Sequence, residues 1–235
     1  MPKEITLIRL LLLFLLFLPL WAQLETRITA IKGSSAKIEP VQAVKGMSGI
    51  VIHHFDADHS TIVARAIYQG GDTIVFDVYD ALAQESLPKP KILPHEGDEV
   101  LLGYLYDRSL LIAPNLQTYQ HYVATHPDTQ WLHPDLFAVE LSKARHPVPQ
   151  KEDFKNFCNK FAVGTIHFVL KNRVVEADCY TLSAIHSDPF TIKKSTIKLP
   201  FYSRIKEIES SIFDFFGPKE IPDYFSYYAH LLEAK

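Results

Sequence analysis

The 235-residue sequence is 47% hydrophobic and 22% charged, and its formal net charge is −3. A chain of this length and composition can bury a hydrophobic core and fold as a globular protein without help from a metal or cofactor. Because it is mildly acidic and has no basic block, it lacks the electrostatic pattern of a nucleic-acid-binding protein, and that class is excluded.

Residues 1–22 have the pattern of a signal peptide. Lys3 and Arg9 precede an uninterrupted apolar run over residues 10–18, and Ala22 offers a cleavage site. The apolar stretch is shorter than the ~20 residues of a membrane-spanning helix. The sequence therefore predicts export, to the periplasm or the cell surface, of a mature chain without a transmembrane segment. The alternative is an uncleaved anchor.

Residues 23–106 are predicted to form a β-rich subdomain. Apolar and polar residues alternate in six short segments: TRITAIKG, SAKIEP, SGIVIHHF, STIVARAIYQ, DTIVFDVYD and DEVLLGYLY. Turn pairs such as Gly33-Ser34 and Gly97-Asp98 suit hairpins. A small closed or half-closed β-barrel is the most economical arrangement for such strands. The proline-rich segment 87–95 is expected to cross the subdomain in an extended conformation.

Residues 107–235 are predicted to form an α/β subdomain. After RSLLIAP the apolar period changes from two to about three and a half residues, and helices are expected to begin near Pro114, Pro134 and Pro149. The strands TIHFVL and VVEADCYTL follow, joined by a tight turn at residues 171–173. This half of the chain indicates helices and strands layered together.

Two amphipathic helices are expected near the C-terminus, along apolar stripes from Ile205 to Phe215 and from Tyr224 to Leu232. Nine aromatic residues lie in the range 201–228; they either pack on the body of the protein or form an adhesive patch for a partner or membrane surface. The fold class predicted from all these elements is α+β. A β-barrel-like subdomain precedes a mixed α/β layer and the two C-terminal helices.

The two cysteines are candidates for a disulfide, because an exported protein meets an oxidising compartment. Cys158 shares helical spacing with Phe154 and Phe161, which places it toward a core. Cys179 continues the alternation that puts Val175 on the same strand face. The bridge Cys158–Cys179 and a pair of buried free thiols are both compatible with this pattern.

The segment HHFDADHS is the densest group of metal-ligand types. A hairpin tip could bring His53 and His59 together with Asp56 or Asp58, and zinc accepts such a set. The same residues also describe an ordinary polar turn, and His53 and His54 point to opposite faces of a regular strand. A metal-binding function over His53–His59 is therefore kept as an alternative, and no metal ligand is assigned.

Motifs for catalysis are missing from the sequence. GMSGI has Ile50 where a nucleophile elbow needs its second glycine, and there is no phosphate-binding loop, dinucleotide fingerprint or CxxC pair. Asp107 and Arg108 are expected to form an ion pair. Histidines beside prolines at helix junctions are expected to be solvated or to cap helices: His126, His133 and His146. No catalytic residue is predicted, and the protein is expected not to be an enzyme.

Several longer stretches resemble a known family. They are SGIVIHHFDADHSTIVARA, LPKPKILPHEGDEVLLGYLYDRSLLIAPN, WLHPDLFAVELS, PVPQKEDFKNFC and LPFYSRIKEIESSIFDFFG. Together they resemble the N-terminal domain of the PgbA-type plasminogen-binding proteins, which are exported surface proteins of gut-colonising bacteria. The resemblance covers the whole mature chain, and it implies a non-enzymatic protein that captures host plasminogen.

The resemblance also implies a lysine ligand, since plasminogen's kringle modules take lysine side chains. A C-terminal lysine adds a carboxylate to the ammonium and so offers a two-ended ligand. Longer family members carry a lysine-rich extension, whereas this sequence ends at Lys235, which makes Lys235 the candidate ligand. Lys193 and Lys194, on an expected loop, are weaker candidates. A different hypothesis is a periplasmic or envelope scaffold that docks other envelope proteins through the barrel and the aromatic helices.

Overall fold

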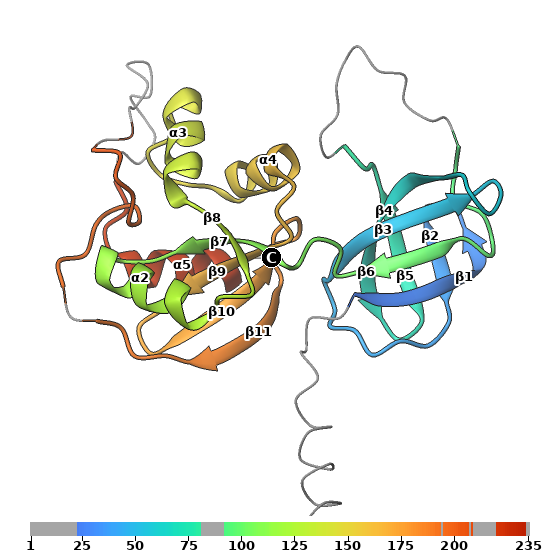
Figure 1. Ribbon diagram of the computed structural model, residues 1–235, viewed down its shortest axis with the longest axis horizontal. Coiled ribbons are helices and arrows are strands. Elements are labelled where there is room, and N and C mark those ends of the chain that lie inside the picture. Colours follow the sequence, from blue (N-terminus) through green and yellow to red (C-terminus); the bar gives the residue numbers. More distant parts are fainter. Residues whose placement is uncertain (1–22, 81–91, 194, 207, 209–219, 234–235) are drawn as a thin grey trace, which may run out of the picture.

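The computed structural model describes residues 23–80, 92–193, 195–206, 208 and 220–233. These residues form a closed β-barrel beside a five-stranded sheet that carries helices on both faces (Figure 1). The predicted α+β class is confirmed. The predicted signal peptide, most of the extended segment 87–95, and Lys194 and Lys235 lie outside the described residues.

The barrel has six antiparallel strands in the order β1-β2-β5-β4-β3-β6. The strands are β1 (Leu24–Lys32), β2 (Ser35–Ile38), β3 (Ser48–His54), β4 (Ser60–Gly70), β5 (Thr73–Asp77) and β6 (Glu99–Leu102). They coincide with the six segments of alternating polarity, because each strand sends alternate side chains into the barrel. Val51, Ala66, Ile74, Val100 and Leu102 lie in the resulting core, and β6 closes the barrel by pairing with both β1 and β3.

The sheet has the order β11-β10-β9-β7-β8. Its strands are β7 (Arg108–Ile112), β8 (Gln130–Leu132), β9 (Thr165–Val169), β10 (Arg173–Asp178) and β11 (Ala184–Pro189). β7 pairs in parallel with β8 and β9, and the remaining pairs are antiparallel. The predicted hairpin between TIHFVL and VVEADCYTL is the β9–β10 pair.

Helices cover both faces of this sheet: α2 (Leu116–Thr125), α3 (Pro134–Ala144), α4 (Lys151–Phe161) and α5 (Tyr224–Glu233). Successive strand residues point to opposite faces. Leu110, Ile166 and Val175 share one apolar cluster with residues of α3, α4 and α5. Leu111 and Val169 share another with residues of α2. The sheet is therefore buried between two helical layers.

Local sequence accounts for the helix starts. The Asn115 side chain accepts a hydrogen bond from the backbone N–H of Thr118 and caps α2. α3 begins at Pro134, where the missing N–H costs nothing, and His133 Nδ1 accepts from the N–H of Asp135. The helices α2, α3 and α4 all begin where proline or asparagine predicted a helix start. His133 thus caps a helix, His126 ends α2, and His146 bonds Asp153, as their positions indicated.

Some expectations need correction. β8 and β11 were not predicted. The predicted ion pair between Asp107 and Arg108 is wrong within the described residues, because both side chains bond Gln130 instead and Arg108 also donates to the carbonyls of Phe161 and Ala162. Most of the helix expected from Ile205 to Phe215 lies outside the described part of the chain, and its described residues are not helical.

The described aromatic residues of the C-terminal region pack on the body of the protein. Phe201, Tyr224 and Tyr228 are buried in the core between the sheet and α3 to α5. The Tyr224 hydroxyl donates to the carbonyl of Ile112 on β7, which fixes α5 against the sheet. These three side chains are therefore not available as the docking surface on which the envelope-scaffold hypothesis relied.

Candidate functional site

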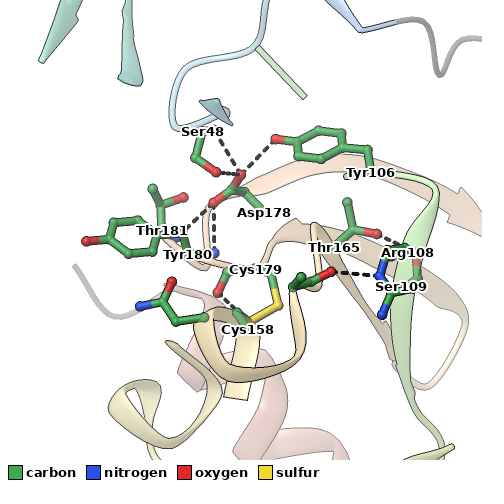
Figure 2. The surroundings of a disulfide bond; sticks show 12 residues. Ser48, Tyr106, Arg108, Ser109, Cys158, Thr165, Asp178, Cys179, Tyr180 and Thr181 are labelled. Atoms are coloured by element: carbon green, nitrogen blue, oxygen red, sulfur yellow. Dashed lines mark hydrogen bonds between the residues drawn. A yellow bond between two sulfur atoms is a disulfide. The ribbon is translucent and has the colours of Figure 1, made fainter. Parts of the chain in front are cut away.

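A buried carboxylate joins the barrel to the sheet. Asp178, at the end of β10, is 0% exposed. Its Oδ2 accepts hydrogen bonds from the backbone N–H of Ser48 (2.8 Å), the Ser48 hydroxyl (2.7 Å) and the Tyr106 hydroxyl (2.8 Å). Its Oδ1 accepts from the backbone N–H groups of Tyr180 (3.0 Å) and Thr181 (2.8 Å). Figure 2 shows these donors converging on Asp178. The carboxylate thus binds β3, the connection between barrel and sheet, and its own turn.

Burial and the neighbouring charge of Asp178 raise the pKa of Tyr106 well above its ordinary value. The phenol therefore stays protonated and acts as a donor. This supports a structural role for the Tyr106–Asp178 pair, since a group that cannot change its protonation state near neutral pH is a poor acid–base catalyst.

Close backbone contacts surround the same junction. Gly46 has a φ of +94°, and a Cβ there would lie 2.2 Å from the Ser183 hydroxyl. A Cβ on Gly164 would lie 2.2 Å from the carbonyl oxygen of Leu105. Both positions need glycine, because the chain segments of barrel and sheet approach too closely for any side chain. The Thr181 hydroxyl adds a 2.7 Å hydrogen bond to the carbonyl of Gly46.

A buried arginine forms a second link across the junction. Arg65, on β4, is 8% exposed, and its Nη2 donates to the Asn159 side chain of α4 at 2.9 Å. Its guanidinium lies 3.8 Å from the ring centroid of Tyr180 and 5.3 Å from that of Tyr79. Cation–π attraction of this kind is strongest when the cation is desolvated. Arg65 is thus held between the barrel, α4 and the turn after β10.

Arg65 lines a small cavity of about 20 Å³ together with Ser48, Tyr104 and Gly164. Within the described residues, Arg65 Nε has no hydrogen-bond partner. A polar cavity of this size holds about one water molecule. It is too small for an organic substrate, so the junction is a structural connection and not a binding pocket.

Cys158 of α4 and Cys179, just after β10, form a disulfide. Figure 2 shows it beside Asp178. Both cysteines lie in the same apolar core as Val175. This is the inward orientation that the helical spacing of Cys158 and the strand alternation of Cys179 predicted. The bridge therefore fixes α4 to the same turn that holds Asp178 and Tyr180.

A row of polar side chains is buried between the sheet and α2. The Ser109 hydroxyl bonds that of Thr165 at 2.7 Å, and Thr165 bonds His167 Nε2 at 3.4 Å. The Tyr122 hydroxyl lies 3.0 Å from His167 Nδ1. Glu176 Oε1 lies 3.9 Å from His167 Nε2, beyond hydrogen-bond length, and has no hydrogen-bond partner among the described residues.

The order hydroxyl, imidazole, carboxylate is that of a nucleophilic triad, but Ser109, Thr165, His167 and Glu176 are each at most 4% exposed. A substrate has no direct access to Ser109 in this arrangement. The row is therefore better explained as a buried polar network than as an active site.

The same burial shifts two pKa values in opposite directions. Desolvation, with a smaller effect of Asp188, raises the pKa of Glu176 to about 8. Desolvation, with smaller effects of His126 and His186, lowers the pKa of His167 to about 3. Both groups are therefore neutral between these values. A neutral carboxyl group explains how an oxygen of Glu176 can remain buried without a partner.

The metal-binding cluster over His53–His59, which was kept as an alternative to an ordinary polar turn, is not formed. His59 bonds Asp56 at the exposed hairpin tip, at 2.7 Å. His53 instead bonds Asp98, at 2.8 Å, on the neighbouring strand connection, and His95 lies beside both. Sequence proximity had suggested the wrong partner, because β3 pairs with β6 as well as with β4.

Of the three lysine candidates, the structure describes only Lys193. Lys235 and Lys194 lie outside the described residues. Lys193 is exposed, and its backbone N–H and carbonyl bond Thr118 and Asn115 at the start of α2. Two further described lysines, Lys143 and Lys160, both bond Glu140 of α3.

Within the described ranges, no helix is both long and apolar enough to cross a membrane. No solved structure is significantly similar to this chain.

Two curated relatives are the plasminogen-binding proteins PgbA of Helicobacter pylori strains J99 and 26695. Each is 26% identical over 185 residues, which cover 77% of this chain and 40% of the relative. The matched region is thus less than half the length of either relative. The names of both relatives describe binding. A family model described as the plasminogen-binding protein PgbA N-terminal region matches residues 23–232. The chain therefore belongs to the PgbA N-terminal domain family.

Proposed function

We propose that this protein is exported and binds plasminogen through a lysine ligand. The observation that carries the proposal is the family match over residues 23–232, which begins directly after the predicted cleavage site at Ala22. The curated relatives are named for plasminogen binding. The description of the family as a binding protein also supports a non-enzymatic role.

Lys235 is the proposed ligand. A lysine at a C-terminus offers an ammonium and a carboxylate together, whereas an internal lysine offers only the ammonium. Some described lysines also have competing partners. Lys143 and Lys160 share Glu140, and Lys198 donates to the backbone carbonyls of Ser203 and Ile205. A kringle site would have to replace these contacts, which makes these three lysines weaker candidates.

Surface plasmon resonance on immobilised plasminogen tests this role. Deleting Lys235 is expected to abolish the part of the binding that a lysine analogue such as 6-aminohexanoic acid displaces. A matched control is Lys193→Ala, which removes an exposed internal ammonium and is expected to leave binding unchanged. Analogue-sensitive binding that survives deletion of Lys235 and is lost in Lys193→Ala would assign the ligand to the loop.

Export needs its own measurement, because plasminogen meets only the outer surface of a cell. Labelling of intact cells with a membrane-impermeant amine reagent is expected to modify the protein. Labelling only after the envelope is opened would place it in the periplasm and would contradict the plasminogen role.

A further inference from the structure

Three potential metal ligands meet at one end of the barrel. His53 is the penultimate residue of β3, and Ile52 pairs with Glu99 at the start of β6. Asp98 precedes β6 and therefore lies beside His53, with Oδ1 2.8 Å from His53 Nδ1. The strand pairing that closes the barrel thus places an imidazole against a carboxylate 45 residues away in the sequence.

The third member, His95, is held by a tight turn. The Asp98 N–H donates to the carbonyl of His95, and the His95 N–H donates to Asp98 Oδ2 at 2.8 Å. Gly97, at a φ of +90°, allows the turn and donates its N–H to the carbonyl of Ile28 on β1. Because Oδ2 of Asp98 is fixed by the turn, Oδ1 is directed toward the histidines.

The hydrogen bond between His53 and Asp98 explains two of the three side chains but not the third. The His95 imidazole lies in tilted contact with that of His53, at a centroid distance of 5.1 Å. It makes no hydrogen bond to any described residue. Yet one ligand atom from each of His53, His95 and Asp98 lies within 4.8 Å of the other two.

We propose that His53, His95 and Asp98 bind a zinc ion. Two imidazoles and one carboxylate are a set that zinc accepts, at about 2.0–2.2 Å from each ligand atom. Tetrahedral ligand atoms are then roughly 3.4 Å apart, so small side-chain rotations bring this cluster to the required spacing. The single carboxylate offsets part of the charge of the ion. The hydrogen bond of Asp98 Oδ2 to the turn orients the ligating oxygen, as outer-shell contacts do in zinc sites.

The position of the cluster determines what the ion does. The ion joins the end of β3 to the turn before β6, and so adds a link between these two segments at one end of the barrel. His53 is 23% exposed and Asp98 is 6% exposed in their side chains, while His95 is exposed. An ion can therefore enter from solvent, and three protein ligands leave a fourth position for water or another ligand. This role is separate from the proposed lysine ligand.

The chain contains matched controls for surface binding of zinc. His59 bonds Asp56 on the tip of the same hairpin, and His186 bonds Asp188 on β11. Within the described residues, neither pair gains a third ligand. If exposed histidine–aspartate pairs alone captured zinc, these pairs would do so equally well.

The test is a calorimetric titration of the purified, chelator-treated protein with Zn²⁺ at neutral pH. Wild-type protein is expected to bind one zinc ion per chain and to melt at a higher temperature with zinc than without it. His95→Ala is expected to lower the zinc affinity by more than about tenfold, since loss of even an outer-shell contact can cost that much. Because the His95 side chain is exposed, this variant keeps the fold, which circular dichroism verifies.

His59→Ala and His186→Ala are expected to retain wild-type affinity. Wild-type protein that takes up no stoichiometric zinc would overturn the proposal. Equal affinities of wild type and a folded His95→Ala variant would also overturn it, as would loss of binding in His59→Ala with retention in His95→Ala.

Discussion

Replacing Asp178 should show how strongly the barrel–sheet junction contributes to stability. Asp178→Ala removes the acceptor of three backbone N–H groups, the buried one of Ser48 and the partly buried ones of Tyr180 and Thr181. The two hydroxyl donors, on Ser48 and Tyr106, can rotate toward other acceptors, but the backbone groups cannot. A buried donor left without a partner costs about 1–3 kcal/mol, and a partly buried donor costs less because water can reach it, so the free energy of unfolding should fall by about 3 kcal/mol.

Asp178→Asn should have a smaller effect. The amide can place its oxygen toward the N–H groups of Tyr180 and Thr181 and its NH₂ toward the hydroxyls of Ser48 and Tyr106, which then accept. In this orientation only the Ser48 N–H loses its acceptor, because it faces the NH₂ group of the asparagine. The expected cost is about 1–3 kcal/mol, from one lost donor and from weaker, neutral hydrogen bonds.

Urea unfolding followed by circular dichroism measures both variants. Asp77→Asn is the control, since exposed Asp77 accepts a hydrogen bond from Tyr180 at the same junction and should cost less than about 1 kcal/mol. The expected order of destabilisation is alanine at 178, then asparagine at 178, then asparagine at 77. An Asp178→Ala protein as stable as the Asp77→Asn control would refute the role given to the carboxylate.

Three further predictions concern other buried groups. Folded Glu176 keeps its proton up to a pKa of about 8, whereas the unfolded group loses it near 4.5, so its contribution to stability falls as pH rises between these values. The pKa of His167 is lowered to about 3, so below its ordinary value of 6.5 the histidine makes stability rise with pH and offsets the effect of Glu176. The net loss of stability, about 2 kcal/mol, therefore falls between pH 6.5 and 8. Urea unfolding at several pH values should show that Glu176→Gln removes this loss. Cys158→Ser opens a disulfide that spans 21 residues of sequence and should cost about 3 kcal/mol relative to oxidised wild-type protein, whereas reduced wild-type protein should be about as unstable as the variant. Arg65→Lys keeps the charge but loses the planar stack on an aromatic ring, and should lower stability by about 1–2 kcal/mol without changing secondary structure by circular dichroism.

Local pattern was sufficient for most of the fold. The six barrel segments alternate with a period of two because each strand has one buried face, and all but one of the connections between them carry glycine. The starts of α2, α3 and α4 followed from asparagine at the cap, proline at the first helical position and proline just before the cap, respectively. β8 was missed because it has three residues, and β11 because it is mostly exposed and so has no buried face to generate a pattern. Neither strand carries enough local information to be distinguished from a loop.

The candidate sites depended more on distant contacts. The inward orientation of Cys158 and Cys179 could be predicted, because each follows from the period of its own element. The environment of Asp178 could not, since its partners Ser48 and Tyr106 are 130 and 72 residues away in the sequence. The neighbours of His53 could not be predicted for the same reason. His59 is close to His53 in sequence, whereas the pairing of β3 with β6 places Asp98 and His95 beside it.

The junction has a consequence for how this protein can bind a large partner. Asp178 and Arg65 connect the barrel to the sheet half through a buried carboxylate and a stacked cation, and the disulfide fixes α4 to the turn that follows Asp178. Together these contacts leave little freedom for the barrel to rotate against the sheet. A partner that touches both parts therefore need not order them first, and the entropy cost of association is reduced accordingly. If the junction is weakened by Asp178→Ala, binding that spans both parts should weaken with it, whereas binding confined to Lys235 should not change.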